Sequence, residues 1–335
     1  MVALLVALAV AMALGVALGS VRLSPSVVAN VILHRIGVRS DAPSRAADTI
    51  VWVVRLPRVL LAAFVGAGLA MVGAALQATV RNPIADPFLL GISSGASVGA
   101  VIVITAGVLG SLGVYALSAA AFVGAIAAAG AVLLLSTGRR GMSPLRIVLA
   151  GTAMTYACSA ITSFLIFRSR RAEAAQTMLF WLLGSLSGAS WAKLVPSAVV
   201  VAVGGAVLWA HGRHLNALLS GDATAASLGV DVTRFRRSVV IVTALMTATV
   251  VAVSGAIGFV GLLLPHVGRF LVGSDHRRLL PVCALLGATY LVIVDLGARM
   301  LAAPEEIPVG IITAGVGAPF FLWLLARHER REARL

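Results

Sequence analysis

Residues 255–281 read GAIGFVGLLLPHVGRFLVGSDHRRLLP, an apolar run that contains Pro265 and ends in a polar cluster. The same skeleton occurs earlier, because residues 73–91, GAALQATVRNPIADPFLLG, match 255–273 without a gap and place Pro83 on Pro265. Two interpretations fit this match. Either the chain holds two related halves, or glycine and proline break membrane helices at two unrelated places.

The composition predicts an integral membrane protein. Of the 335 residues, 60% are hydrophobic and 11% are charged, whereas a soluble domain carries about 25% charged residues. The apolar runs are roughly 20 residues long and do not alternate with polar residues, which favours membrane-spanning helices and excludes a β-barrel. The net charge of +14 lies in the loops, without the aromatic neighbours that would indicate nucleic acid binding. Cys158 and Cys283 lie inside apolar runs, which indicates buried thiols rather than a disulfide framework or a metal site.

We predict an all-α polytopic membrane protein in which residues 1–335 form one transmembrane domain. Ten apolar runs define its spans, at 2–21, 59–80, 92–111, 115–136, 145–167, 194–210, 238–255, 258–272, 279–299 and 308–326. An even number puts both termini on one side, and loop arginines are slightly more numerous there, so the positive-inside rule places both termini in the cytoplasm. The runs at 238–255 and 258–272 lie so close together that hydropathy alone also fits one long helix.

The two matching stretches follow the second and the seventh spans and therefore run through the membrane in opposite directions. Halves near 55–170 and 237–330 would then form an inverted repeat. Many transporters use inverted halves with broken helices to build a pathway that opens to either side. Pro83 and Pro265 are candidate hinges, because proline frees a backbone carbonyl and lets a helix bend.

A long polar stretch at 211–237 separates two spans on the side of the termini. Within it, Leu215–Val230 reads as a short helix interrupted by Gly221, and the carboxylate of Asp222 is placed to cap the helix that follows. One face carries small and apolar side chains, namely Leu218, Leu219, Ala223, Ala226 and Leu228. This pattern is typical of a helix at the membrane surface, either against a partner or merely in the interface.

Arginines gather on the opposite side. Arg55 and Arg58 stand three apart in RLPR, with Pro57 at the natural first position of a helix, so both guanidinium groups leave one face of the second span. They suit either acidic groups of a docking protein or lipid headgroups. Asp295 and Arg299 are four residues apart and can pair on one helical face, although Arg299 can also reach outward.

Two further polar features lie in the apolar chain. Arg168, Arg170 and Arg171 precede the apolar and aromatic stretch MLFWLLGSLSG, and they form either a positive rim that attracts an anionic substrate or a solvated loop. His266 stands beside Pro265, where we predict a helix break, and is a hinge neighbour, a ligand or a hydrogen-bonded polar group.

The chain lacks the residues that several activities require. Its single lysine, Lys193, is followed by leucine, so the sequence has no phosphate-binding loop for ATP. Coupling to protons or sodium usually needs acidic residues within spans, whereas the carboxylates here lie in loops or near helix ends. No His/Glu cluster has the spacing of a metalloprotease, so we predict neither an enzyme nor a metal site. The energy for transport must come from elsewhere.

Several ordered motifs resemble those of the FecCD-type permeases, the membrane subunits of ATP-driven bacterial importers for cobalamin, ferric siderophores and haem. They cover nearly the whole chain after the first helix: RLPR at 55–58, GAALQATVRNPIADPFLLGISSGASVG at 73–99, FWLLGSLSGASW at 180–191, SGDATAASLGVDV at 220–232, the opening stretch at 255–281, and VDLGAR followed by EEIPVGIITAGVGAPFFLWLL within 294–325.

The resemblance implies a type II ABC importer permease with ten helices and cytoplasmic termini in the bacterial inner membrane. A second copy, expected to be identical, would form the pathway with it. Two cytoplasmic ATPase subunits would use ATP, and a periplasmic binding protein would deliver the cargo. No cofactor is expected to stay bound, and the expected surroundings are membrane lipid and not nucleic acid.

The resemblance also assigns residues. Segment 211–237 would hold the coupling helix that sits in a cleft of the ATPase, through Leu215, Asn216, Leu218, Leu219, Ser220, Gly221, Asp222, Ala223, Ala226, Leu228 and Gly229. Arg55, Arg58 and Arg299 match positions at which family members present arginines to glutamates of the binding protein. Arg168, Arg170 and Arg171 lie outside the matched motifs and are a candidate substrate entrance.

The basic segment at 168–171 favours a cargo with exposed negative groups. Haem, with two propionates, is therefore our first expectation, ahead of ferric siderophores and of cobalamin, which has no carboxylates. The alternative from another class is an ion-coupled secondary transporter or a channel. Such a protein would transport without an ATPase and would need an intramembrane charge network that the sequence does not reveal.

Overall fold

The chain is almost entirely helical in the computed structural model, which describes residues 1–19, 21, 23–39, 41–138, 141–169 and 172–332. Its elements are α1 (Val2–Ala17), α2 (Pro25–Arg35), α3 (Arg45–Asp48), η1 (Thr49–Arg55), α4 (Leu56–Val80), η2 (Pro87–Leu90), α5 (Ile92–Ala106), η3 (Gly110–Tyr115), α6 (Ala116–Ser136), β1 (Thr137–Gly138), β2 (Gly141–Met142), α7 (Pro144–Arg168), α8 (Ala172–Leu182), α9 (Trp191–Ala210), α10 (Gly212–Leu219), α11 (Asp222–Ser227), α12 (Val232–Ser254), α13 (Val260–Val272), α14 (His276–Met300) and α15 (Val309–Glu332).

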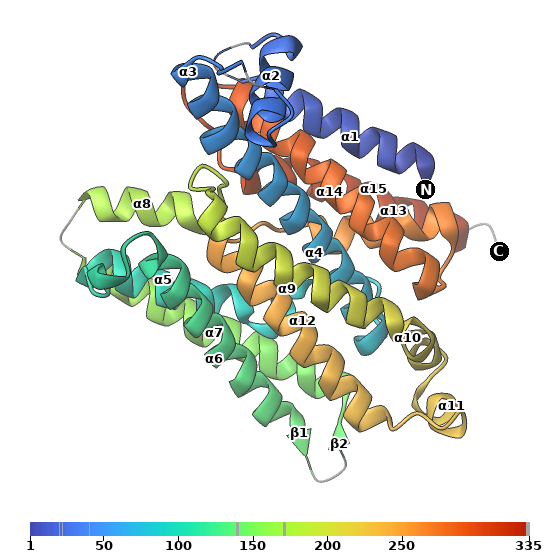
Figure 1. Ribbon diagram of the computed structural model, residues 1–335. Coiled ribbons are helices and arrows are strands. Elements are labelled where there is room, and N and C mark those ends of the chain that lie inside the picture. The colour runs from blue at the N-terminus through green and yellow to red at the C-terminus, as the bar shows by residue number, and fades with distance from the viewer. Residues whose placement is uncertain (20, 22, 40, 139–140, 170–171, 333–335) are drawn as a thin grey trace.

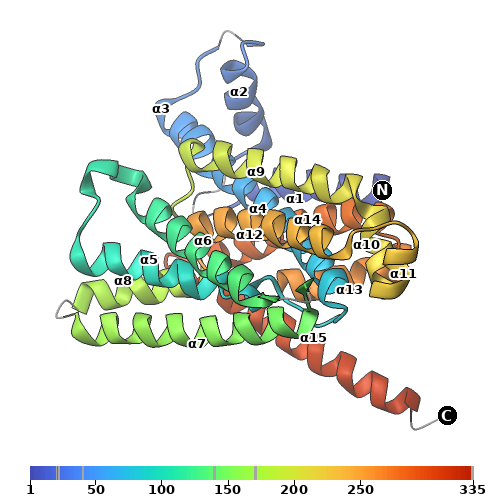
Figure 2. The same ribbon diagram turned by 90° about the horizontal axis from the view of Figure 1, so that it is seen from below.

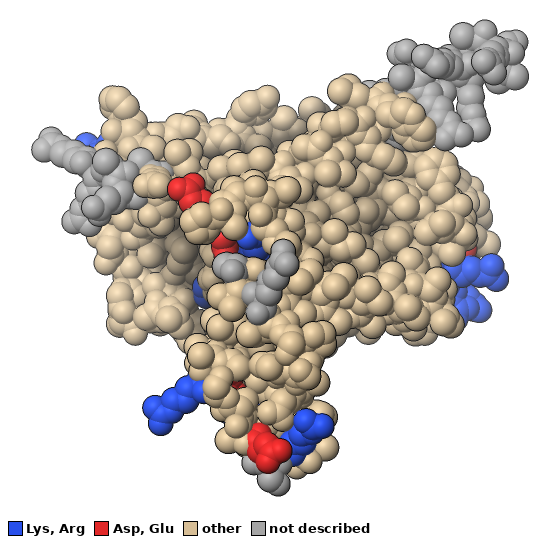
Figure 3. Space-filling view, turned by 90° about the horizontal axis from the view of Figure 1, so that it is seen from above, with Lys and Arg blue, Asp and Glu red and all other residues tan. Residues whose placement is uncertain are grey.

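Among the described residues, ten apolar helices correspond to the ten predicted spans. Six are long and apolar enough to cross a membrane by length and composition, within Arg45–Val80, Gly110–Ser136, Pro144–Arg168, Trp191–Ala210, Val232–Ser254 and His276–Met300. Four shorter apolar helices lie at Val2–Ala17, Ile92–Ala106, Val260–Val272 and Val309–Trp323. Figure 3 shows a broad uncharged surface on which charged side chains gather in a few small groups, as expected for a protein surrounded by lipid.

Helix α4 forms the centre of the fold. It lies among α14, α13, α12 and α9 (Figures 1 and 2). Of the most apolar stretch within the helical run Arg45–Val80, 83% is buried in the protein. α4 approaches α14 closely at Gly66 and Gly287, where a Cβ on Gly66 would lie 2.1 Å from the carbonyl oxygen of Gly287. Facing glycines let two helices pack at backbone contact, which strengthens their association in a membrane.

The start of α4 differs from the prediction. We expected Pro57 at the first position of a helix, but the helical run begins at Arg45 and continues through the π-helical η1 into α4. Proline lacks an amide hydrogen and crowds the preceding turn, and the widened turn of η1 accommodates it. Arg55 and Arg58 therefore lie inside a long helix and not at its free end.

Residues 238–272 form two helices and not one. α12 ends at Ser254 and α13 begins at Val260. Between them, Gly255 has φ 67° and ψ −167°, and a Cβ at this position would meet the carbonyl oxygen of Trp181 at 2.2 Å. Backbone conformation and close packing both require glycine here, which fixes the position of the break.

The two candidate hinge prolines lie in different settings. Pro83 lies in the loop between α4 and η2, whereas Pro265 lies inside α13, so the predicted helix break at Pro265 is wrong. Proline leaves the carbonyl oxygen four residues earlier without its helical donor. Nε2 of Gln77 donates to that oxygen, on Gly261, at 3.2 Å. α4 thus replaces the missing hydrogen bond and keeps α13 intact, and the hinge role of both prolines stays a prediction.

The molecule has two ends, named here the α10–α11 end and the α2–α3 end. The start of α1 and the last turns of α15 lie at the α10–α11 end (Figures 1 and 2), which agrees with an even number of spans. α4 runs toward this end and α12 runs away from it, because Arg236 near the start of α12 contacts Thr79 near the end of α4. The predicted second and seventh spans, α4 and α12, therefore run in opposite directions. The matching stretches themselves do not, because α13 returns to the α10–α11 end, where Asp275 contacts Asn216. The origin of the chain as halves near 55–170 and 237–330 stays a prediction.

Candidate functional site

Helices α10 and α11 form the surface of one end of the molecule. A turn at Gly221, with φ 108°, separates them, which confirms the predicted interruption. Leu215 and Leu218 are fully buried against the rest of the chain. Ala217 and Ala225 are buried as well. Six small or apolar residues are exposed, and we name them the α10–α11 patch: Leu219, Ser220, Ala223, Ala226, Leu228 and Gly229. An exposed patch of small and apolar residues suits contact with a partner or with the membrane interface.

Asn216 ties α10 to the start of α14. Its Nδ2 donates to Oδ1 of Asp275 at 2.7 Å, and its Oδ1 accepts from the backbone nitrogen of His276 at 2.9 Å. Asp275 in turn accepts from the backbone nitrogen of Arg277, in the first turn of α14, at 3.1 Å. The hydrogen bond from Asn216 holds the pKa of the Asp275 carboxyl below its usual range. α10 is therefore anchored by polar contacts as well as by its leucines.

Arg236 joins three further elements to α12. Its side chain is 1% exposed, and its guanidinium donates to the carboxylate of Asp222 on α11 at 2.8 Å and 3.2 Å. Nη1 also donates to the carbonyl oxygen of Met142 on β2 at 2.8 Å, and Nε donates to that of Thr79 on α4 at 3.4 Å. Because β2 leads into α7, this one side chain connects the surface helix α11 with the ends of three membrane-spanning helices.

Asp222 does not cap α11, contrary to the prediction. The capping position is Gly221, and Asp222 is the first residue of the helix. Its carboxylate faces Arg236 and also lies 3.5 Å from the guanidinium of Arg81. A guanidinium offers two parallel charged donors, which bind a carboxylate more strongly than backbone amides do. The hydrogen bond from Arg236 holds the pKa of Asp222 below its usual range.

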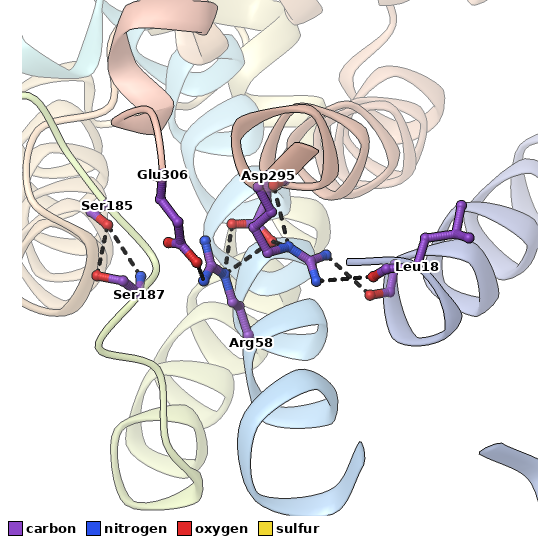
Figure 4. A network of polar contacts seen from close by, with 8 residues as sticks. Leu18, Arg58, Ser185, Ser187, Asp295 and Glu306 are labelled. Atoms are coloured by element: carbon purple, nitrogen blue, oxygen red, sulfur yellow. Dashed lines mark hydrogen bonds and ion pairs between the residues drawn. The ribbon is translucent and has the colours of Figure 1, made fainter. Parts of the chain in front are cut away.

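At the opposite end, Arg58 lies between two carboxylates (Figure 4). Its Nε donates to Asp295 at 2.9 Å, and its Nη1 donates to Glu306 at 2.9 Å. Asp295 also pairs with Arg299, one turn later on α14, at 3.1 Å, which confirms the predicted pair. The side chain of Asp295 is 1% exposed and that of Glu306 is 40% exposed. The network thus runs from the interior of the fold to the surface.

Two arginines satisfy the C-terminus of α1. The last carbonyl groups of a helix have no donors within it, and they form the negative end of its dipole. Nη1 of Arg55 donates to the carbonyl oxygens of Val16 and Ala17, both at 2.9 Å. Nη2 of Arg299 donates to that of Gly15 at 3.0 Å. These contacts bind α1 to α4 and α14.

The three arginines assigned to the binding protein therefore face the interior. Arg55, Arg58 and Arg299 are 5%, 6% and 6% exposed. The expectation that the RLPR guanidinium groups leave the helix toward a partner is wrong for this structure, because carboxylates and free helix carbonyls of the same chain lie within their reach. Arg58 comes nearest to the surface, beside Glu306. A docking role for the three arginines stays a prediction.

The candidate substrate entrance is described in part. Arg168 is the last residue of α7 and is exposed, whereas Arg170 and Arg171 lie outside the described residues. His266 lies on α13 with its ring edge to face against Phe270, at 4.9 Å between centroids. Within the described part of the chain, no group of three or more His, Cys, Asp or Glu side chains could hold a metal ion.

Sequence reasoning missed Arg236, Gln77 and Glu306. The signal for Arg236 is its spacing, because it shares the buried face of α12 with Val240 and Thr243, four and seven residues later. The signal for Gln77 is an uncharged polar residue in an otherwise apolar helix, where it needs a partner. Glu306 follows Glu305 in a loop, and its sequence neighbourhood does not indicate which of the two would contact Arg58.

The chain is similar to known permeases over most of its length. The cobalamin import system permease protein BtuC of Halobacterium salinarum is 47% identical over 285 residues, which cover 85% of this chain and 75% of that protein. The vitamin B12 import system permease protein BtuC of Salmonella typhi is 39% identical over 292 residues, which cover 87% of each chain.

Solved structures agree with this similarity. A metal-chelate type ABC transporter in an inward-facing conformation aligns with a TM-score of 0.85 and 32% identity, over 97% of this chain and 98% of that one. PsaBC from Streptococcus pneumoniae, in complex with a Fab, aligns with a TM-score of 0.55 and 16% identity, over 80% of this chain and 89% of that one, and shows a shared fold alone. The model of the FecCD transport family matches residues 5–327, and this chain therefore belongs to that family, as its motifs predicted.

Proposed function

We propose that this chain is the permease subunit of an ATP-driven importer whose cargo is cobalamin. The observation that carries the cargo is the similarity, at 47% and 39% identity over at least 85% of this chain, to permeases named for cobalamin and vitamin B12 import. The first expectation, haem, rested on the basic segment 168–171, and neither relative is named for haem. Cobalamin therefore replaces haem as the proposed cargo.

The proposed energy source is a pair of separate ATPase subunits that bind the α10–α11 patch. The patch is exposed and uncharged, while Leu215 and Leu218 beneath it are buried. A surface held from below in this way can receive a partner without unfolding. Movement of α11 would reach α12, α4 and α7 through Asp222 and Arg236, since those side chains join the four elements. Alternating access would follow from that movement.

The proposed pathway lies between this chain and a second, identical copy. Hydroxyl groups occupy one exposed face of α7, at Thr152, Tyr156, Ser159 and Ser163. Intervals of four, three and four residues place them on one side of a helix. Polar side chains in a membrane-spanning helix usually face a bundle interior or a water-filled space and not lipid. A second copy against α7 would enclose such a space.

The proposed docking point for a binding protein is Arg58 with Glu306. The carboxylate of Glu306 is 40% exposed and already holds Nη1 of Arg58. A glutamate from a partner would have to displace Glu306, since Asp295 holds Arg58 from the buried side. Arg55 and Arg299 would keep α1 and Asp295 in place and would not touch the partner.

A secondary transporter is the weaker proposal. Asp295 is the one acidic residue fully buried among the described residues, and both Arg58 and Arg299 pair with it. The pair with Arg58 fastens α4 to α14, and the pair with Arg299 lies within α14. This network therefore suits a structural role.

The test is uptake into proteoliposomes that contain this chain, its ATPase subunit and its binding protein. We expect ATP-dependent uptake of cobalamin, and no uptake of haem or ferric siderophore under the same conditions. Uptake of haem instead would keep the importer and overturn the cargo. Uptake of any cargo without the ATPase subunit would overturn the importer itself.

A further inference from the structure

Two hollows in the surface meet at Lys193. The first, of about 190 Å³, has polar groups in its wall, among them Ser118, Ser185 and Ser187. The second, of about 310 Å³, is a mostly apolar groove whose wall includes Phe122 and Val200. Lys193 lines both, as do Ser118, Ala252 and Val253, so the two are adjacent. We name them the head hollow and the tail groove.

The tail groove lies where α6 and α9 both pack against α12 (Figure 2). Tyr115, at its mouth, is 48% exposed. In a membrane, an exposed apolar groove of this kind is filled by acyl chains, because water and polar solutes do not enter the hydrocarbon region. The tail groove is therefore expected to hold an acyl chain of a membrane lipid.

Lys193 determines which chemical group suits the junction of the two hollows. It is the single lysine of the chain, and the carbonyl oxygen of Gly188, at 2.9 Å, accepts one of the three hydrogens of its ammonium group. None of the described residues that line either hollow is acidic. The ammonium group thus keeps two donors and an unneutralised positive charge at the junction of a polar hollow and an apolar groove.

Lys193 lies at the depth in the membrane where lipid headgroups are found. Lys193 lies in the first turn of α9, and Ser185, in the loop before it, donates its backbone nitrogen to the carbonyl oxygen of Ser254, the last residue of α12, at 2.8 Å. Both helix ends belong to the α2–α3 end of the molecule. Trp181 and Tyr115 line the two hollows at this level, and tryptophan and tyrosine concentrate where headgroups meet acyl chains.

We propose that the head hollow and the tail groove form a binding site for an anionic phospholipid. An acyl chain lies in the tail groove between α6 and α9, and the phosphate of the headgroup pairs with Lys193. The inference requires only that the chain lies in a membrane, and it goes beyond the proposed cargo and energy source.

A third hollow supplies an internal comparison. It has about 420 Å³, lies between α5 and α6, and its lining residues, such as Val98, Ile102 and Leu109, include none that is charged. It would hold acyl chains of any lipid without regard to the headgroup. The two grooves should therefore differ in selectivity and not in their capacity for lipid.

The experiment uses the purified permease with its ATPase subunit and phospholipids that carry a photoreactive group on the acyl chain. Phosphatidylglycerol and phosphatidylcholine with identical chains are compared, and cross-linked peptides are mapped. At segment 192–200, which lines the tail groove and not the third hollow, we expect about fivefold more labelling by phosphatidylglycerol, because one lysine near a membrane surface gives a preference of that order for an anionic lipid. Labelling at 98–109 should be equal for both lipids.

Four variants decide the assignment. Lys193→Gln should remove the preference at segment 192–200, and Lys193→Arg should keep it. Arg45→Gln removes an exposed cation at the same end that lines neither hollow, and it should leave the preference intact. Val200→Trp fills the groove with Lys193 unchanged and should reduce labelling by both lipids, which keeps the proposal testable even if Lys193→Gln does not fold.

Two results would overturn the proposal. A fivefold preference that survives in Lys193→Gln would show that the lysine does not select the headgroup. Displacement of the labelled lipid by cobalamin at segment 192–200 would show that the hollows belong to the cargo. The uptake assay is independent of both results, so the failure of this site and the failure of the proposed importer are distinguishable.

Discussion

The two ends of the molecule each hold an arginine against a carboxylate, but they expose different partners. At the α10–α11 end, the side chain of Arg236 is 1% exposed and that of its partner Asp222 is 43% exposed. At the α2–α3 end, the side chains of Arg58 and Asp295 are 7% and 1% exposed. The first pair exposes its carboxylate at the surface, whereas the second is buried and reaches the surface only through Glu306.

This difference separates a contact that can transmit a movement from one that holds the fold. A buried ion network is costly to break, because a single loss leaves charges without partners in a low-dielectric interior. At the α10–α11 end the carboxylate of Asp222 is in contact with water, so it can leave Arg236 without becoming a buried charge that has no partner. The α10–α11 end is therefore suited to move with an ATPase, and the α2–α3 end is suited to stay fixed.

The largest effect should come from Asp295→Ala. It removes the shared partner of Arg58 and Arg299, and breaking a buried pair of this kind costs about 3–5 kcal/mol. The midpoint of detergent-induced unfolding should fall sharply, as should the yield of monodisperse protein. Asp48→Ala breaks the pair of Asp48 with Arg35, whose side chains are 21% and 43% exposed, and should cost about 0–1 kcal/mol. Equal losses of stability in the two variants would show that the buried pair contributes no more than the partly exposed pair.

The next effect should come from Arg236→Gln. It removes the charged contact with Asp222 and leaves carbonyl groups of α4 and β2 without a donor, a change of about 1–3 kcal/mol in stability. Uptake per ATP hydrolysed should fall at least about tenfold, a change in coupling of about 1.4 kcal/mol. Arg234→Gln is the matched control, because Arg234 lies on the same helix, is 89% exposed and pairs only with Asp231 among the described residues. Coupled transport in Arg236→Gln at the level of Arg234→Gln would contradict the connecting role.

A surface change at the same end should disturb binding without disturbing the fold. Ala226 is exposed on α11, so Ala226→Trp should alter stability by less than about 0.5 kcal/mol. Affinity for the ATPase subunit, measured by titration in nanodiscs, should nevertheless fall about tenfold because a large ring enters the contact. Leu145→Trp, at a 68% exposed site on α7 outside the patch, is the control. Unchanged affinity in Ala226→Trp would place the ATPase elsewhere.

The fold was largely predictable because hydropathy and helix breakers act locally. The ten apolar runs, the interruption at Gly221 and the Asp295–Arg299 pair follow from spacing alone, since four residues bring two side chains together on any helix. Pro265 was misjudged for the opposite reason. Proline breaks a helix by leaving a carbonyl unsatisfied, and Gln77, almost two hundred residues away, supplies the donor at Gly261. No local pattern contains that contact.

The candidate site was predictable in position and not in detail. Segment 211–237 was identified by its polarity between two spans, and the patch residues are exposed as a partner surface requires. The direction of charged side chains was not predictable. Asp222 faces Arg236 instead of its own helix, and Arg58 faces Asp295, because each charge takes the strongest partner that the fold brings within reach. Such choices depend on packing between distant helices.

The smallest expected effect, and the sharpest comparison, is Glu306→Gln. The amide oxygen can still accept from Nη1 of Arg58, and a pair with a 40% exposed member contributes about 0–1 kcal/mol in water. Stability should therefore hardly change, in contrast to Asp295→Ala. Affinity for the binding protein should rise about twofold to fivefold at low salt, because an incoming glutamate no longer competes with a charged one.

Glu305→Gln separates this effect from a change in net charge. It removes the same charge one residue earlier, and no contact between Glu305 and Arg58 is found in the described part of the chain. If both variants raise the affinity equally, long-range attraction alone accounts for the gain and Arg58 is not the docking point. If only Glu306→Gln raises it, the one exposed member of the sealed network is the place where that end of the molecule receives its partner.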